Sequence, residues 1–364
     1  MANDAITMTG IFDKFGASAQ KACWTLAESK IAESARCAGD EPVNRAILFF
    51  GGANPEENHS RYYDNLRDVI QGLKEKGVKS ENIIVMHADG LDPALDQSVN
   101  PGYIVNSEMD FLRNEGIAVI PATQDGLENV FGTLRPFLKD NDHTLFYAFD
   151  HGGQDISGET ETLVGWHNEH IKDTDFAKIV DGLPGYKAYY FSECYSGGMI
   201  EDISIADGKT FVASATAPDE VSFGGEDGYA GGFAKALSLF GKTHELHEAA
   251  SAMDKYADTS GHIEQVLVHG QEVCVEHPQM RGANFPVFYI PEIDDEPDNI
   301  EAIAEYGKQN DFVTDDEYVA DDELDNIEAI AEYGKQNDFV TDDEYVADDE
   351  SDYDDEDFID SDFE

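Results

Sequence analysis

Two residues that could do chemistry together, a histidine and a cysteine, stand 43 positions apart. His151 occurs in FDHGGQ and Cys194 in YFSECYSGGM, and each follows a short apolar run. A free thiol has a pKa of about 8.5, and its thiolate is a strong nucleophile. An imidazole with a pKa of about 6.5 can accept or return a proton during acyl transfer. The pair therefore predicts thiol catalysis, with Cys194 as nucleophile and His151 as general acid and base.

Glycines accompany both residues. The backbone N–H groups of Gly152 and Cys194 are expected to stabilise the oxyanion that forms when a thiolate attacks a carbonyl. The SGG turn after Cys194 is expected to open a helix, whose dipole favours a thiolate. Taken alone, either residue is also consistent with a structural, non-catalytic role. A single cysteine, for example, is often a small buried side chain.

The elements that must position this pair form an α/β pattern. Strand-length apolar runs alternate with helical patterns, which is typical of a mostly parallel sheet covered on both faces. In such sheets, ligand sites form beyond the carboxyl ends of the strands. The expected strands are Arg45–Phe50, Asn82–Met86, Thr144–Phe149, Ala188–Phe191 and Thr210–Ala213, and the expected helices are Tyr62–Lys76, Leu127–Leu138 and Asp173–Leu183.

The segments FDHGG and YFSECYSGGM resemble the legumain (asparaginyl endopeptidase, C13) family of caspase-like cysteine peptidases. AILFFGGANPEENHSRYYDNL and VKSENIIVMHADG extend the resemblance, which covers Arg45 to Phe233. It implies a caspase-like three-layer sandwich over 41–290, with a mostly parallel central sheet and helices on both faces. It also implies an endopeptidase that works through a Cys-His dyad and a thioester acyl-enzyme. Asn58 falls where the family orients the catalytic histidine, and Asp150 at a position that can cyclise to a succinimide.

The substrate pocket departs from the family pattern. The acids that the family places two residues before and one after the thiol are replaced by Ser192 and Tyr195, and the family's arginine is shifted by one position. Cleavage after Asn or Asp is one expectation, and cleavage after a basic residue, with Asp219 or Glu193 in the pocket, is the other. The expected substrate-binding residues are Arg61, Glu193, Ser214, Thr216 and Asp219.

A strongly acidic tail follows the expected catalytic domain. The chain has 77 Asp+Glu against 23 Lys+Arg, a net charge of −54, of which residues 291–364 carry −30. Within 291–364, a 26-residue sequence at 298–323 is repeated without change at 325–350. Such like-charge runs repel themselves, so a disordered tail is expected. It is also a candidate pro-segment that the enzyme removes itself. A helical extension is expected over 1–40.

Composition excludes several other functions. The acidic balance argues against nucleic acid and anionic membranes as partners, since phosphate contacts need clustered Lys and Arg. No apolar run of about 18 residues occurs, and no signal peptide is evident, which predicts a cytoplasmic protein. No cofactor or metal is expected, because His244 and His247 are spaced three apart and not four as in the zinc motif. The alternatives to a peptidase acting on proteins or peptides are a catalytically inactive binding module of the same fold and an acidic interaction protein.

Overall fold

The computed structural model describes residues 29, 40–100, 103–107, 109–154, 160–223, 225–258, 265–268 and 271–290. Apart from Ser29 and Asp40, the expected N-terminal extension lies outside the described residues. The acidic tail with its two repeats lies outside them as well.

A seven-stranded sheet forms the centre of the described part, in the order β14-β11-β10-β6-β1-β2-β5. Six strands run parallel to their neighbours, and β14 joins β11 antiparallel at one edge. The strands are β1 (Asn44–Phe50), β2 (Ile83–His87), β5 (Ala118–Ile120), β6 (His143–Phe149), β10 (Tyr186–Phe191), β11 (Thr210–Ser214) and β14 (Gln279–Gly282).

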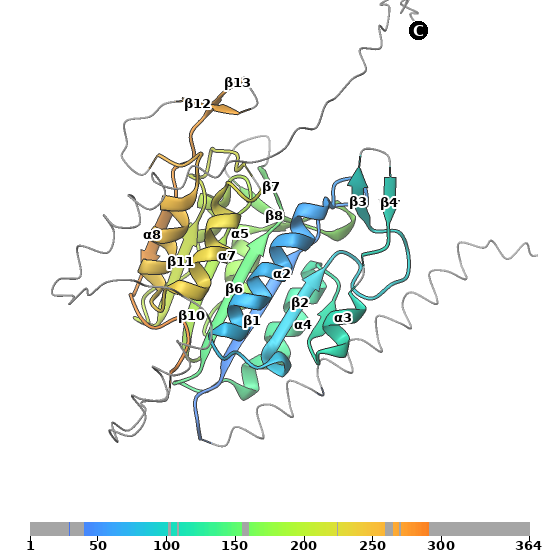
Figure 1. Ribbon diagram of the computed structural model, residues 1–364. Coiled ribbons are helices and arrows are strands. Elements are labelled where there is room, and N and C mark those ends of the chain that lie inside the picture. Colours follow the sequence, from blue (N-terminus) through green and yellow to red (C-terminus); the bar gives the residue numbers. More distant parts are fainter. Residues whose placement is uncertain are drawn as a thin grey trace, which may run out of the picture. The chain divides into compact units, whose positions relative to one another are not determined.

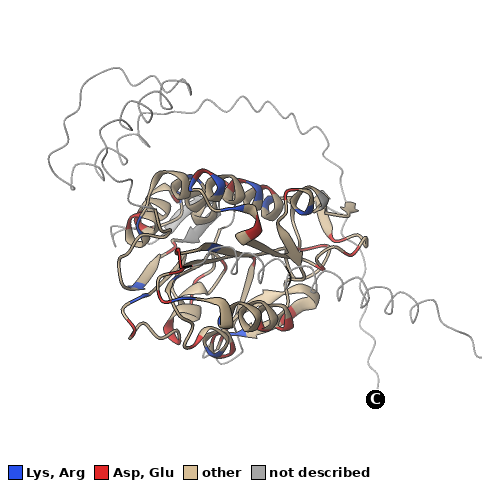
Figure 2. Cartoon of the chain, turned by 90° about the horizontal axis from the view of Figure 1, so that it is seen from below, with Lys and Arg blue, Asp and Glu red and all other residues tan. Residues whose placement is uncertain are grey.

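Helices cover both faces of this sheet, as Figure 1 and the view from below in Figure 2 show. The helices are α2 (Ser60–Glu75), α3 (Asp110–Asn114), α4 (Gln124–Leu134), α5 (Asp173–Val180), α6 (Ser196–Glu201), α7 (Tyr229–Leu239) and α8 (Thr243–Met253). Alternate side chains of β1 enter opposite cores, since successive strand residues point to opposite faces. Leu48 packs in the core that contains residues of α2, α7 and α8, and Phe49 in the core that contains residues of α4, α5 and α6.

The expected three-layer α/β sandwich is confirmed. Each of the five apolar runs forms a central strand, and each of the three helical patterns forms a helix, with ends shifted by a few residues. Burial on both faces explains why continuous apolar runs identify these strands. Figure 2 colours Lys and Arg blue and Asp and Glu red, and such residues occur in the covering helices and in the loops.

Three small sheets project from this frame. One consists of β7 (His151–Gln154), β8 (Glu161–Gly165) and β9 (Glu169–Lys172), paired antiparallel. The other two are the hairpins β3 (Gln97–Asn100) with β4 (Tyr103–Val105), and β12 (Gln265–Val268) with β13 (Gln271–Cys274). The expected histidine loop is thus the start of a short strand, and its pairing with β8 fixes the backbone beside His151.

No helix in the described part of the chain has the length and apolar character needed to cross a membrane.

Candidate active site

The backbones that carry His151 and Cys194 lie directly against each other. Both follow neighbouring parallel strands, His151 after β6 and Cys194 after β10. A β-carbon placed on Gly152 would come within 1.8 Å of the Cys194 carbonyl oxygen and 3.0 Å of its backbone nitrogen. Only glycine permits this approach, because any side chain would overlap the backbone of the cysteine loop. The two sequence-predicted residues are therefore brought together at one edge of the sheet.

The imidazole of His151 is oriented by the first loop and by helix α2. Its Nε2 lies 3.1 Å from the Tyr62 hydroxyl and 3.1 Å from the Glu57 carbonyl oxygen. A carbonyl can only accept, so the tautomer that suits Glu57 carries its proton on Nε2 and leaves Nδ1 as the basic nitrogen. Burial, followed by the Arg61 and His151 charges, lowers the pKa of the adjacent His59, which keeps that ring neutral.

Tyr62 is the residue at this site that the sequence reasoning missed. It is buried, and its ring packs edge-on against His151 at 5.5 Å between centroids. Burial, and then the charge of Asp150, raises the tyrosine pKa, so the hydroxyl stays protonated. The sequence clue to Tyr62 was its position, two residues into the helix that follows the glycine-bearing loop. The glycine loop and the start of α2 jointly supply the histidine's partners.

The Cys194 thiol is partly covered by a neighbouring segment. Its Sγ accepts the Ser222 N–H at 3.3 Å and lies 3.7 Å from the Ser222 carbonyl oxygen. Burial raises the pKa of the thiol, the Ser222 N–H lowers it, and the Glu276 and Glu193 carboxyls raise it further. The net direction is upward, so the resting thiol is protonated at neutral pH.

The N–H of Cys194 has no backbone carbonyl partner among the residues that the structure describes. The next residue, Tyr195, adopts a left-handed conformation with φ of 60° and directs its own N–H to the Glu220 carbonyl at 2.6 Å. A left-handed tyrosine costs about 1–3 kcal/mol, so the surrounding structure must hold it there. Helix α6 begins at the following residue, as the SGG turn predicts.

Asn58 and Asp150 are both buried. The Asn58 side-chain amide donates to the Asp96 carbonyl at 2.6 Å and not to His151. Asp150 is buried, and its Oδ1 accepts the His151 N–H at 2.7 Å. Burial raises the pKa of Asp150 well above its usual value, although the N–H groups of His151 and Gly52 oppose this. Cyclisation of Asp150 stays a prediction.

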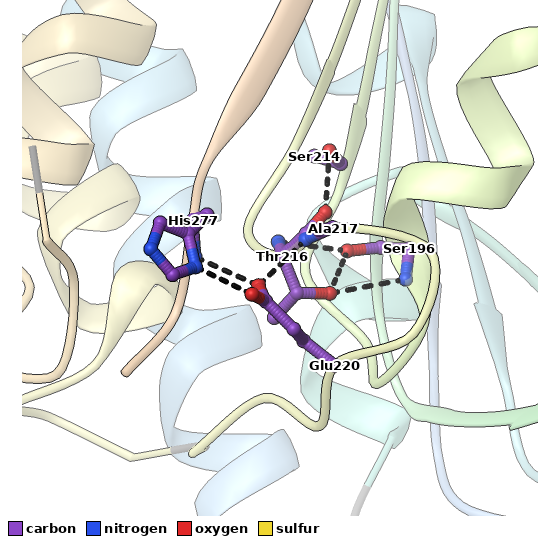
Figure 3. Close-up of polar contacts among 6 residues, drawn as sticks. All are labelled: Ser196, Ser214, Thr216, Ala217, Glu220 and His277. Carbon is purple, nitrogen blue, oxygen red and sulfur yellow. Dashed lines mark hydrogen bonds and ion pairs between the residues drawn. The ribbon is translucent and has the colours of Figure 1, made fainter. Parts of the chain in front are cut away.

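Three of the expected pocket residues are fully buried. Glu193 is 1% exposed, and burial raises its pKa well above the usual value. Thr216 Oγ1 accepts the Ser196 N–H at 3.2 Å and lies 3.1 Å from the Ser196 hydroxyl, while Ser214 donates to the Thr216 carbonyl (Figure 3). These contacts tie the start of α6 to the loop after β11. Ser214 and Thr216 therefore support the cysteine loop.

Arg61 and Asp219 are exposed. The Arg61 guanidinium lies 5.0 Å from the centre of the Tyr62 ring and donates to its hydroxyl at 3.3 Å, which places it beside His151. Asp219 makes no hydrogen bond or ion pair with any of the described residues. The neighbouring Glu220, which the sequence analysis did not select, accepts the N–H groups of Ala217 and His277 and pairs with the His277 ring (Figure 3).

The described residues contain no group of three or more His, Cys, Asp or Glu side chains arranged to hold a metal ion. The polar groups gathered at this site are the thiol, the imidazole, the tyrosine hydroxyl and backbone N–H groups.

Comparison with known proteins points to one family. Residues 125–251 match the Peptidase C13 family. The chain is 25% identical over 202 residues to the vacuolar-processing enzyme beta-isozyme of Arabidopsis thaliana, covering 50% of this chain and 39% of that protein. It is 27% identical over 203 residues to legumain of Canavalia ensiformis, covering 51% and 41%. The chain thus spans about two fifths of the length of these curated relatives. The expected resemblance to the legumain (C13) family is confirmed.

Proposed function

Because residues 125–251 match the Peptidase C13 family and the chain is similar to two legumain-type proteins, we propose that it is a cysteine endopeptidase with Cys194 as nucleophile and His151 as general acid and base. The observation that carries the proposal is the backbone contact at Gly152, where the histidine strand and the cysteine loop meet. Contact this close is expected where two side chains must act on one substrate bond.

In the proposed reaction, the Cys194 sulfur attacks the scissile carbonyl carbon, and the thiol proton passes through the His151 imidazole to the leaving amine. The bond that breaks is the peptide C–N bond, and a thioester to Cys194 remains. Water, deprotonated by the imidazole, then attacks the thioester and regenerates the thiol. Glu57 and Tyr62 hold Nε2, which leaves Nδ1 for these transfers.

The oxyanion of each tetrahedral intermediate would be stabilised by the unoccupied N–H of Cys194 and the N–H of Gly152. Loss of one such donor typically costs about a hundredfold or more in rate. Asn58 would act from behind the loop that carries Glu57, as a support for the histidine's partner.

For specificity, we propose cleavage after Asn or Asp, with Arg61 beside the histidine to receive the side chain. The alternative is a basic side chain bound by Asp219, which is exposed. The burial of Glu193 makes it a weaker candidate for direct contact, and it fits a role in supporting the loop. Ser214 and Thr216 would shape the pocket through the loop that they hold.

The acidic tail is proposed as a substrate of the enzyme itself. Each copy of its repeat contains two asparagines and many aspartates, so an Asn- or Asp-specific enzyme would find repeated cleavage sites. Intact mass measured during incubation is expected to fall for the wild type and to stay constant for Cys194→Ala. A constant mass in both proteins would contradict self-processing.

A peptide library that varies the residue before the scissile bond tests catalysis and specificity together. The wild type is expected to cleave after Asn and Asp, with no cleavage by Cys194→Ala. Cleavage after Arg or Lys alone would favour the basic alternative. Cleavage that survives in Cys194→Ala would refute the assignment of the nucleophile.

One observation favours a second candidate, a catalytically inactive binding module. The thiol is partly covered by Ser222, and its pKa is raised by burial. Such a thiol would react slowly with alkylating reagents, and the library would remain uncut. Rapid labelling of Cys194 with cleavage of a library peptide would reject the inactive module.

A further inference from the structure

The segment Glu220–Phe223, called the strap below, lies on the Cys194 sulfur. One residue contacts the thiol through both of its backbone polar groups, since the Ser222 N–H donates to Sγ at 3.3 Å and the Ser222 carbonyl lies 3.7 Å from it. A third contact joins the strap to the cysteine loop, from the Tyr195 N–H to the Glu220 carbonyl at 2.6 Å. A substrate carbonyl must approach the same sulfur, which the strap partly covers.

Two consecutive residues fasten the strap. Glu276 accepts the Phe223 N–H with one carboxyl oxygen and the Ser222 hydroxyl, at 3.4 Å, with the other. His277 donates its N–H to Glu220 at 2.9 Å and pairs with the same carboxyl through its ring (Figure 3). Both ends of the strap are therefore tied to one short stretch of chain just before β14.

Glu276 is itself rigidly held. The residue is fully buried, its N–H donates to the Tyr256 carbonyl at 2.9 Å, and its carbonyl accepts the Asp258 N–H at 2.9 Å. The titratable groups that act on it or respond to it are Asp254 at the end of α8, Tyr256 and Cys194. Burial and the Asp254 charge raise the pKa of Glu276, so it is neutral at neutral pH.

A neutral carboxyl in this position differs little from an amide. Either group has a carbonyl oxygen for the Phe223 N–H and a second polar atom for the Ser222 hydroxyl. Glutamine at 276 should therefore keep the strap in place, whereas alanine removes both contacts. Alanine also leaves the Phe223 N–H without its acceptor, which costs more than the contact itself is worth.

We propose that Glu276 is a positioning residue that fastens the strap onto the Cys194 sulfur and so controls access to this thiol. The inference deepens the proposed function, since it rests on Cys194 being the reacting group. The proposal makes a buried carboxyl, which contacts the strap rather than the thiol, control when the Cys194 sulfur is uncovered.

Alkylation of Cys194 tests the strap without any need for peptidase activity. Labelling rates with small iodoacetamide and with a bulky maleimide are compared, site by site, by peptide mass mapping. The proteins are wild type, Glu276→Ala and Glu276→Gln, with the exposed Glu248→Gln as a charge control. The alanine variant is expected to react about tenfold faster with the bulky reagent, a factor that matches the loss of one or two hydrogen bonds.

The glutamine variant and the charge control are expected to match the wild type within about twofold, less than the effect of one hydrogen bond. An unchanged bulky-reagent rate in Glu276→Ala would overturn the proposal. An equal acceleration by Glu276→Gln would also overturn it, because glutamine keeps the two contacts that alanine removes. If Glu276→Ala lacks a cooperative thermal transition, Ser222→Ala replaces it. This variant loses only the hydroxyl contact, and an unchanged rate there would contradict the strap.

The two proposals can fail separately. If the wild type cleaves no peptide but the alkylation rate of Cys194 still depends on Glu276, the peptidase proposal fails and the strap proposal stands. If the wild type cleaves peptides but Cys194 is alkylated at the same rate in all variants, the strap proposal fails and the peptidase proposal stands.

Discussion

The closest contact between the histidine strand and the cysteine loop makes Gly152 the most informative single position. In Gly152→Ala, the new β-carbon would lie 1.8 Å from the Cys194 carbonyl oxygen and 2.7 Å from the carbonyl carbon. Both are backbone atoms, so no side chain can rotate away. The two backbones must part by more than about 1 Å before ordinary contact distances return.

That displacement sets the expected magnitudes. Overpacking of this kind costs typically about 1–3 kcal/mol of stability. A misplacement of about 1 Å between reacting groups can lower the rate about a hundredfold. Gly152→Ala is therefore expected to fold, with a lower thermal midpoint, and to lose about two orders of magnitude in kcat/KM on the best library peptide.

Gly132→Ala provides the matched control. This glycine is in helix α4, is exposed, and has no atom within 4 Å of an added β-carbon. Alanine there should leave activity unchanged and stabilise the helix by about 0.5–1 kcal/mol. Equal activity of Gly152→Ala and Gly132→Ala would refute the reasoning, because it would show that the two backbones are not in contact during catalysis.

Three further outcomes are expected. Tyr62→Phe removes the hydroxyl next to His151 and should lower kcat about threefold to tenfold with little change in KM, whereas steady-state kinetics equal to wild type would contradict this role. Asp142→Ala leaves the buried guanidinium of Arg45 unpaired. The free energy of unfolding, measured in urea, should fall by about 3–5 kcal/mol, and a fall below about 1 kcal/mol would refute this prediction. His87 is fully buried, and burial lowers its pKa from 6.5 to about 3. The unfolded chain binds the extra proton, so this residue's contribution is complete above pH 6.5 and is lost as the pH falls toward 3. His87→Leu should retain about 2 kcal/mol more of its neutral-pH stability than wild type at pH 5, and parallel pH profiles of unfolding would contradict this.

The fold was largely predictable because its central strands are buried on both faces. Runs such as RAILFF and TLFYAF have no polar alternation, and only a covered sheet accommodates them. The edge strands β5 and β14 and the small sheet of β7, β8 and β9 were not among the expected strands. These strands are short, and their pairing depends on tertiary contacts that no local pattern encodes.

The chemistry-bearing pair was predictable from residue type and from its place after two strands, but its surroundings were not. The histidine's partners include a backbone carbonyl, that of Glu57, which any residue type could supply. The thiol's partner is likewise the backbone of Ser222. Glu193 was expected in the pocket, but its side chain is buried, which residue type and position alone do not reveal.

The acyl-enzyme itself is the most direct test of the account. Wild type, Cys194→Ala and Gly132→Ala are mixed with a peptide ester of the best library sequence, quenched in acid, and examined by intact mass and peptide mapping. The account predicts an added acyl group on Cys194 in wild type and Gly132→Ala, and none in Cys194→Ala. Turnover of the ester with no acyl group on Cys194, or with the group on another residue, would contradict it.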